Sequence, residues 1–206
     1  MRQQLNSKRI SVGITGASGA LYALVLLKQL AKYYDEIHVM LTDASRIVFA
    51  TELDIALPQA PAKIEKILSE LANCKESIIK VYSKDNWYSP VASGSAAPKQ
   101  MVICPASMGC VSAIATGASN NLLERAADVV IKEKGQLIIL PREMPFSSIH
   151  LKNLLALSEI GVTIMPAAPG FYNKPQTIDD IANFVVARIL SHLGIDGDLN
   201  KPWGYS

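Results

Sequence analysis

Short apolar runs alternate with stretches of helical periodicity along the 206-residue chain, and this alternation restricts the fold more than any other feature. The first run, 10–15, is followed by leucines that recur every third residue from Leu21 to Leu30, a helical spacing. Strands that alternate with helices are typical of βαβ units, whose strands form a parallel sheet. We predict strands at 10–15, 37–41, 78–82, 101–104, 137–140 and 162–165, and helices at 21–30, 44–50, 63–72, 122–132, 149–160 and 178–193.

The predicted strands are continuous apolar runs, which is the pattern of strands covered by helices on both faces of a sheet. We therefore expect an α/β fold with a Rossmann-like, flavodoxin-type parallel sheet and helices on both faces, formed by residues 1–206 as a single domain. Ligands bind at the carboxyl ends of the strands in such sheets, so the residues that follow each strand are the first candidates for a site.

Composition narrows the class of protein. Half of the residues are hydrophobic and 18% are charged, which excludes a disordered chain and favours an oligomer. The net charge of +2 argues against a nucleic-acid partner, and no apolar run is long enough to span a membrane. Three cysteines do not form a disulfide scaffold, so we expect a cytoplasmic protein. The tail, about 195–206, carries Trp203 and is expected to dock on a neighbouring subunit.

The first predicted strand leads into a turn of small residues, 13–20, that opens a helix. Small side chains let a phosphate approach the backbone, and the N-terminus of a helix offers free N–H groups. The glycine spacing is GxxGxxG, not the GxGxxG of dinucleotide-binding proteins. The turn favours a phosphate or a flavin phosphate; the alternative is a tight turn with Ser18 as the helix N-cap.

A second turn rich in small residues, 104–121, follows the fourth predicted strand and again leads into a helix. Two such turns at one edge of a sheet suit a cofactor that lies across the strand ends. Cys104 and Cys110 have no basic neighbours in this turn, so we interpret both as small buried hydrophobic residues and not as nucleophiles.

Several catalytic motifs are absent from the sequence. No tyrosine is followed by a lysine four residues later, which argues against a short-chain dehydrogenase despite the similar opening at 15–19. The P-loop, HExxH and GxSxG motifs are also missing. The three histidines are scattered, and Asp179 and Asp180 suit a helix start, so no metal site is predicted.

Basic residues recur near the predicted strand ends and helix faces. Arg125 and Lys132 lie seven residues apart on one predicted helix, hence on one face. Arg142 directly follows the fifth strand, at the edge where ligands bind. With Tyr172 and Arg188 they form a set that could converge on a phosphate; the alternative is that each is a solvated surface charge.

Six segments, in order, resemble the flavin prenyltransferase family of the UbiX type, formerly described as aromatic acid decarboxylase subunits. The most specific are 141–147 (PREMPFS) and 166–172 (PAAPGFY). The resemblance runs from about residue 9 to residue 204. The other four segments are 15–19 (TGASG), 92–95 (ASGS), 104–107 (CPAS) and 120–128 (NNLLERAAD).

The resemblance implies a subunit of a dodecamer that uses reduced FMN and dimethylallyl phosphate as substrates. The dimethylallyl group is joined to N5 and then C6 of the flavin, without a metal. The product would serve as the cofactor of a separate UbiD-type decarboxylase, in ubiquinone synthesis or in the breakdown of aromatic acids.

The resemblance also assigns site residues by position. Ser18 and Glu143 match residues that handle protons, and Glu52 matches a glutamate near N5 of the flavin. The family often has Thr where Met108 and Cys110 stand, so only backbone contacts are expected there. The matching FMN-binding residues are Gly16, Ala17, Ser18, Thr42, Ser107, Met108, Gly109, Cys110 and Arg125, and the residues that match the prenyl-phosphate site are Lys132, Arg142, Tyr172 and Arg188.

Two other functions stay open at this point. A flavin-dependent cysteine decarboxylase needs an early catalytic histidine and a Pro-x-Met-Asn motif, but the only early histidine, His38, lies within a predicted strand and the motif is missing. A non-catalytic FMN carrier or regulatory subunit of a decarboxylase would not need the basic cluster. The aromatic residues Trp87, Tyr88 and Trp203 either shield a prenyl cation from water or serve ordinary packing.

Overall fold

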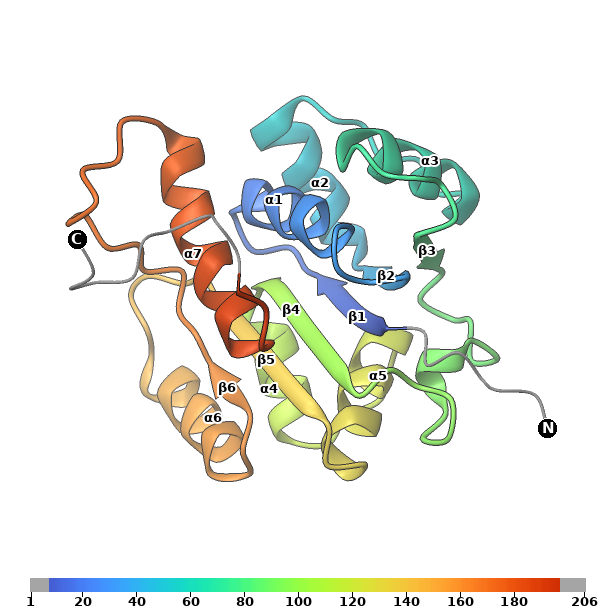
Figure 1. The fold of residues 1–206 in the computed structure, drawn as a ribbon. Helices are drawn as coiled ribbons and strands as arrows, with labels where there is room; N and C mark the ends of the chain where they lie inside the picture. Colours follow the sequence, from blue (N-terminus) through green and yellow to red (C-terminus); the bar gives the residue numbers. More distant parts are fainter. Residues whose placement is uncertain (1–7, 197–206) are drawn as a thin grey trace.

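A six-stranded parallel sheet runs through the centre of the computed structural model, which describes residues 8–196 (Figure 1). The strand order is β3-β2-β1-β4-β5-β6, the order of doubly wound Rossmann sheets and not that of flavodoxin itself. The Rossmann-like parallel sheet is thus confirmed. The strands are β1 (Arg9–Ile14), β2 (Glu36–Leu41), β3 (Ile79–Tyr82), β4 (Gln100–Ala106), β5 (Gln136–Pro141) and β6 (Thr163–Ile164).

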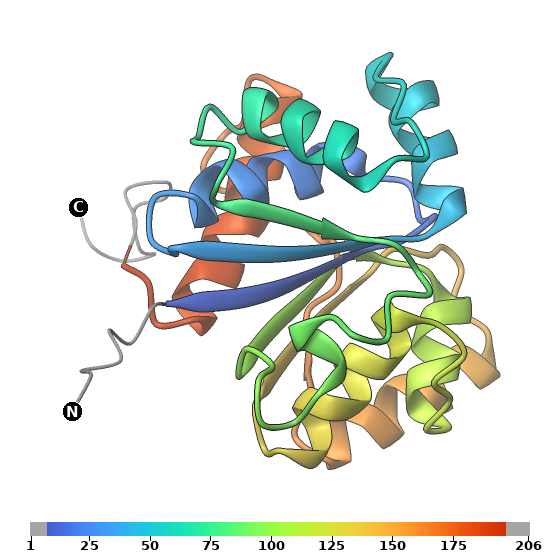
Figure 2. The same cartoon turned by 90° about the vertical axis from the view of Figure 1, so that its right-hand side faces the viewer.

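Helices cover both faces of the sheet, as predicted, and Figure 2 shows the two helical layers on either side of it. Each layer has its own apolar core, because the strands present buried side chains to both faces. One layer holds α1 (Ala20–Leu30), α2 (Asp43–Leu53), α3 (Pro61–Leu71) and α7 (Ile178–His192). The other holds α4 (Met108–Ala115), α5 (Leu122–Lys132) and α6 (Ser148–Glu159).

Helix α4 is not among the predicted elements, because its residues lie in the predicted turn 104–121. The side chains of Met108, Val111 and Ile114 recur three residues apart and are buried, which is a helical pattern. Ser107 caps the helix by accepting the N–H of Cys110 at 3.4 Å. The helix is only eight residues long and rich in Gly, Ser and Ala, so its periodicity is weak in the sequence.

The connection 83–99 contains one short 3-10 helix, η1 (Pro90–Ala92), and otherwise consists of turns. It packs against α5, since Nε of Arg125 donates a hydrogen bond to the carbonyl of Ala92 at 3.3 Å. The predicted docking tail with Trp203 lies, apart from Ile195 and Asp196, outside the described residues.

Candidate functional site

The strand order reverses direction between β1 and β4, and one threonine joins the carboxyl ends of these two strands. The Thr15 hydroxyl donates to the carbonyl of Pro105 at 2.9 Å and accepts the N–H of Ser107 at 2.7 Å. The two predicted turns of small residues therefore lie side by side at the point where doubly wound sheets bind their ligands.

The first turn lies close against the start of α2. A Cβ added at Gly16 would overlap the Cβ of Ala44, so only glycine allows this approach. Thr42 follows β2 and is the N-cap of α2, with its hydroxyl accepting the N–H of Ser45 at 3.2 Å. The structure thus brings together the predicted flavin positions after β1 and β2.

A glutamate from another helix caps the N-terminus of α1. The Glu52 carboxylate, at the end of α2, accepts the N–H of Gly19 at 3.2 and 2.9 Å and the N–H of Ala20 at 2.9 Å. The N-cap is Gly19, with a φ of 113°, and no side chain of its own caps the helix, so the alternative of Ser18 as N-cap is wrong. The sequence favoured a phosphate at this helix start. The N–H groups of Gly19 and Ala20 are not free to bind one, because they already donate to the Glu52 carboxylate.

The surroundings of Glu52 favour its ionised form. Burial alone would raise the pKa of the carboxyl, but hydrogen bonds from the Ser18 side chain and the Gly19 and Ala20 backbone, together with the Arg142 charge, outweigh burial. The pKa of Glu52 therefore lies below its ordinary value, and the group is a carboxylate at neutral pH.

Arg142 joins the end of β5 to the same turn, since its Nε donates to the carbonyl of Ser18 at 3.3 Å. Ser18, Glu52 and Arg142, all predicted site residues, line one cavity of about 470 Å³. The apolar residues that line the rest of this cavity were not predicted from the sequence. Those on α7 recur at helical spacing, which was the only available signal. Together, the apolar lining residues form a wall that consists of Leu21, Tyr22, Leu53, Ala167, Ile178, Ile181 and Ala182.

The second turn is the start of α4. Met108 is buried, and nothing lies within 4 Å of the position that a Cβ at Gly109 would take, so the backbone there is open. Cys104 is buried as predicted, whereas Cys110 is only partly buried. Burial raises the pKa of Cys110 to about 12 and that of Cys104 still further. Neither thiol ionises at neutral pH, which excludes both as nucleophiles.

Two of the predicted basic residues, Arg125 and Lys132, lie on α5 and do not line the cavity. Arg125 pairs with Asp128 at 2.8 Å, and Lys132 pairs with Glu133 at 2.6 Å at the end of α5. Lys132 precedes β5 and Arg142 follows it, so one strand length, roughly 17 Å, separates their backbones. The expectation that Lys132, Arg142 and Arg188 form one cluster is therefore wrong for a single chain.

The remaining predicted residues do not line the cavity. The ring of Tyr172 packs edge-on against Phe184, with 5.5 Å between centroids, and Arg188 lies one helical turn further along α7. Glu143 follows Arg142 and accepts the N–H of Met144 at 3.2 Å. Trp87 and Tyr88 are exposed in the connection between β3 and β4 and do not line the cavity.

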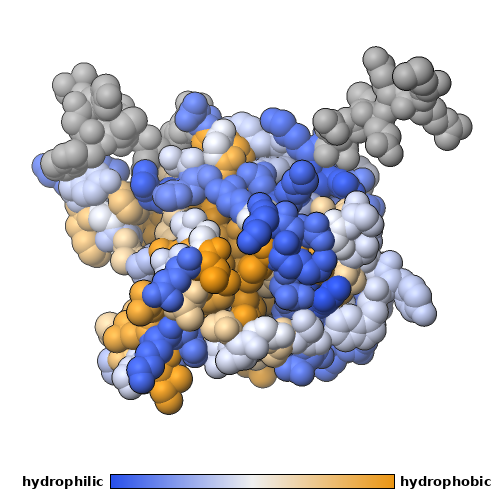
Figure 3. All heavy atoms as spheres, turned by 90° about the horizontal axis from the view of Figure 1, so that it is seen from below, coloured by the Kyte–Doolittle hydropathy of each residue, from blue (hydrophilic) through white to orange (hydrophobic). Residues whose placement is uncertain are grey.

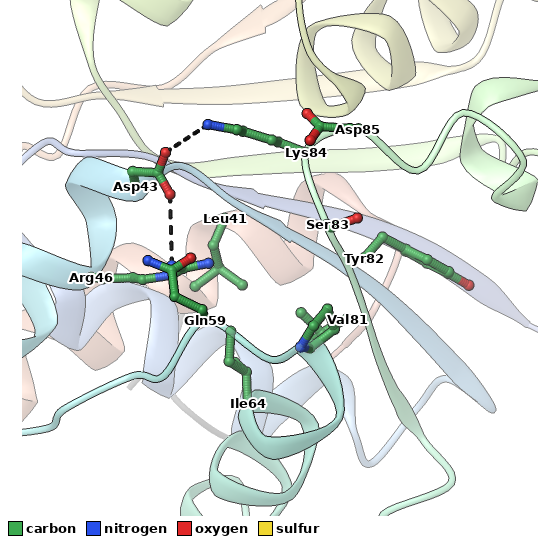
Figure 4. A pocket seen from close by; sticks show the side chains of 11 residues that line it. Leu41, Asp43, Arg46, Gln59, Ile64, Val81, Tyr82, Ser83, Lys84 and Asp85 are labelled. Atoms are coloured by element: carbon green, nitrogen blue, oxygen red, sulfur yellow. Dashed lines mark hydrogen bonds and ion pairs between the residues drawn. The ribbon is translucent and has the colours of Figure 1, made fainter.

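A second cavity of about 370 Å³ lies beyond β2 and β3 and contains none of the predicted site residues. Figure 4 shows Asp43 between two cations, 2.9 Å from Nζ of Lys84 and 3.6 Å from Nη1 of Arg46. The hydrogen bond and charge of Lys84 lower the pKa of Asp43, so both cations already face a carboxylate. This pairing makes the second cavity the weaker candidate for an anion.

Apolar side chains gather on the layer of α4 to α6, and Figure 3 shows apolar areas on this face. Helix α6 buries Leu154 and Leu157 inward yet also exposes leucines outward. The exposed large apolar residues on and next to α6 are Met144, Phe146, Ile149, Leu151, Leu155 and Ile160. Exposed apolar patches of this kind are typical of surfaces that bind another molecule.

Within residues 8–196, no three or more His, Cys, Asp and Glu side chains gather as metal ligands would. In the same part of the chain, no helix combines the length and the apolar character needed to cross a membrane.

Residues 1–190 match the flavoprotein family. The chain is 51% identical to the flavin prenyltransferase UbiX of Pseudomonas aeruginosa over 197 residues. This alignment covers 96% of this chain and 94% of that protein. A dodecameric FMN-dependent UbiX-like decarboxylase from Escherichia coli O157:H7 is 34% identical, with a TM-score of 0.84 over 96% of this chain and 100% of that one. AnUbiX (PadA1), solved in complex with FMN and dimethylallyl pyrophosphate, is 30% identical, with a TM-score of 0.85 over 98% and 100% of the two chains.

Proposed function

The chain belongs to the flavoprotein family and, within it, to the flavin prenyltransferases of the UbiX type, and on that basis we propose that it transfers a dimethylallyl group from dimethylallyl phosphate to N5 and C6 of reduced FMN. The prenylated FMN is then the cofactor of a UbiD-type decarboxylase. The observation that carries this proposal is the cavity in which Arg142, Ser18 and Glu52 face an apolar wall. Such a cavity suits a ligand with an anionic head and a short apolar tail.

The residues at the ends of β1, β2 and β4 fit FMN. The close approach of Gly16 to α2 and the open backbone at Gly109 leave N–H groups accessible at the starts of α2 and α4. We assign FMN binding to Gly16, Ala17, Thr42 and 107–110. When bound, reduced FMN supplies the nucleophilic N5 and C6 atoms.

Arg142 stabilises the leaving group. Cleavage of the allylic C–O bond leaves its electron pair on the phosphate, and we assign the stabilisation of this charge to the guanidinium of Arg142, whose Nε also donates to the carbonyl of Ser18. Glu143, next in the chain, donates a proton to the leaving phosphate, and the hydroxyl of Ser18 relays it. Glu52, held as a carboxylate by three donors, accepts the proton that the flavin releases.

Lys132 joins the phosphate site from a neighbouring copy. It lies at the amino end of β5, where its own Arg142 is out of reach, and its side chain is half exposed. Arg125 lies on the same helix face, and we assign it to the flavin of that neighbour. We also assign Tyr172, in the loop before α7, and Arg188, on α7, to the phosphate site. We place the exposed apolar residues of α6 in the contacts of a dodecamer.

We assign the whole chain, 1–206, to one flavoprotein domain, whose tail docks on a neighbouring subunit. The cytoplasm is the proposed compartment, in agreement with the three free cysteines.

The substitution Arg142→Ala tests the proposed function against the alternative of an FMN carrier. A prenyltransferase should lose turnover by about 10²–10³-fold while it still binds FMN, because one preorganised donor to the developing charge is gone. Lys63→Ala, an exposed change on α3, is the matched control and should keep full turnover. An Arg142→Ala protein with unchanged turnover would contradict the role of this residue, and a wild type without turnover would favour the carrier.

A further inference from the structure

The segment 92–95 (ASGS) lies against both basic residues that we assign to a neighbour's site. It begins at the end of η1, which packs against α5. The carbonyl of Ala92 accepts a hydrogen bond from Nε of Arg125 at 3.3 Å. Gly94 lies beside Lys132 and Glu133, at the C-terminal end of the same helix. The segment is therefore placed to hold the side chains that α5 presents to another copy.

An ion pair at the end of α5 fits closely against Gly94. Nζ of Lys132 donates to Oε1 of Glu133 at 2.6 Å, and the two side chains are each 46% exposed. A Cβ added at Gly94 would overlap Oε1 of Glu133 and lie 3.0 Å from Nζ of Lys132. The φ of Gly94 is not positive, so its backbone would otherwise accept alanine. The absence of a side chain at Gly94 thus leaves the space that the ion pair occupies.

The pair leaves Lys132 able to bind a phosphate. Its ammonium group carries three N–H donors on a flexible stem, and Glu133 accepts one of them. Two donors remain for an anion. The hydrogen bond and charge of Lys132 lower the pKa of Glu133, so this partner is a carboxylate at neutral pH. A lysine held in this way has already lost rotamer freedom that a free lysine would lose on binding.

We propose that Glu133 is a positioning residue, which holds the ammonium group of Lys132 against the 92–95 segment, where Lys132 can contact the donor phosphate of a neighbouring copy. The inference rests on the proposed function for the choice of ligand and for the place of Lys132 in the neighbour's site. It adds Glu133 and Gly94 to the residues on which donor binding depends, and both act through Lys132.

Binding of dimethylallyl monophosphate to the assembled, FMN-loaded protein, titrated by calorimetry, tests the inference without relying on turnover. Glu133→Ala should weaken binding about tenfold, which is the order of the rotamer freedom lost when a lysine is fixed. Glu133→Gln keeps an acceptor for Lys132 and should recover part of this loss. Glu70→Ala removes an exposed carboxylate of α3 that forms no ion pair within residues 8–196. It is the control matched in charge and should bind as the wild type does.

Two double variants show whether the effect passes through Lys132. Glu133→Ala should have no further effect on binding when Lys132→Ala is already present. Gly94→Ala alone should weaken binding, because the new methyl group displaces the end of the Glu133 side chain and not the backbone. It should add little to Glu133→Ala, in which the overlapped carboxylate is gone. Melting temperatures of the single variants should stay close to that of the wild type, since the pair is exposed.

Binding by Glu133→Ala that equals or exceeds that of the wild type would overturn the inference, because a carboxylate that only repels the phosphate gives this result. An effect of Glu133→Ala that persists in full without Lys132 would also overturn it. A protein that shows the expected affinities but forms no prenylated flavin supports the positioning role and contradicts only the proposed function. A wild type without affinity for dimethylallyl monophosphate contradicts both.

Discussion

The Glu52 carboxylate accepts the backbone N–H of Gly19 at 3.2 and 2.9 Å, so a side chain from the end of α2 caps α1. A carboxylate near a helix N-terminus is stabilised by the helix dipole and by the free N–H groups. This contact links α1 and α2, two of the three helices that line the cavity, and it holds Glu52 in its charged form next to Arg142.

Glu52→Gln should change how stability depends on pH. The folded pKa of Glu52 lies below its ordinary value of 4.5, so the ionised group stabilises the fold above about pH 5, and this contribution disappears as pH falls through the folded pKa. Melting temperatures measured from pH 7 to pH 3 should fall less steeply for Glu52→Gln than for the wild type. Parallel curves for the two proteins would contradict the assigned charge state.

Gly16→Ala should destabilise the protein by about 1–3 kcal/mol, because the new methyl group overlaps Ala44. The double variant with Ala44→Gly removes the overlap and should recover part of the loss, which urea unfolding can measure as a coupling energy. Gly109→Ala, where a Cβ meets nothing, is the control and should not destabilise the fold. Strictly additive effects of Gly16→Ala and Ala44→Gly would show that the close approach is not the cause.

Lys132→Ala and Arg142→Ala should each abolish most turnover, yet assemblies formed from both variants should recover some of it. If each site takes Lys132 from one neighbour, random mixing leaves about a quarter of the sites with both basic residues intact. The turnover of co-purified mixed assemblies, compared with that of each parent variant, measures this recovery. Mixed assemblies as inactive as the two parents would place both residues in the same chain, and a fully active Lys132→Ala would remove Lys132 from the site.

Leu151→Glu combined with Leu155→Glu should reduce the size of the assembly, because both side chains are more than half exposed on α6 and a charge there opposes an apolar contact. Sedimentation measures the change, and circular dichroism checks that the subunit still folds. Ile47→Glu, at an exposed apolar position on the other helical layer, is the control. An unchanged assembly would exclude this face of α6 as a subunit contact.

The sheet was predictable because its strands are buried on both faces and therefore appear as apolar runs such as 10–15 and 137–140. Helix boundaries followed from the spacing of apolar residues, and α5 has the predicted bounds, Leu122–Lys132. Helix α4 escaped prediction because its small residues weaken the apolar contrast on which periodicity depends.

The site was less predictable because its contacts join distant parts of the chain. Arg142 and Ser18 lie 124 residues apart in sequence, and only the strand order brings them together. Charge alone grouped Lys132 with Arg142, although α5 and β5 run in opposite directions and separate the two residues. The cap of α1 by Glu52 had no sequence signal, since capping rules consider residues adjacent to the helix.

The mass of the flavin recovered after anaerobic incubation with reduced FMN and dimethylallyl phosphate tests the central claim most directly. The proposed reaction predicts a flavin heavier by one C5 prenyl unit, formed by the wild type and not by Arg142→Ala. Unmodified FMN that stays bound to a folded wild-type protein, with the diphosphate as well as the monophosphate, would contradict prenyl transfer and identify the protein as a flavin carrier.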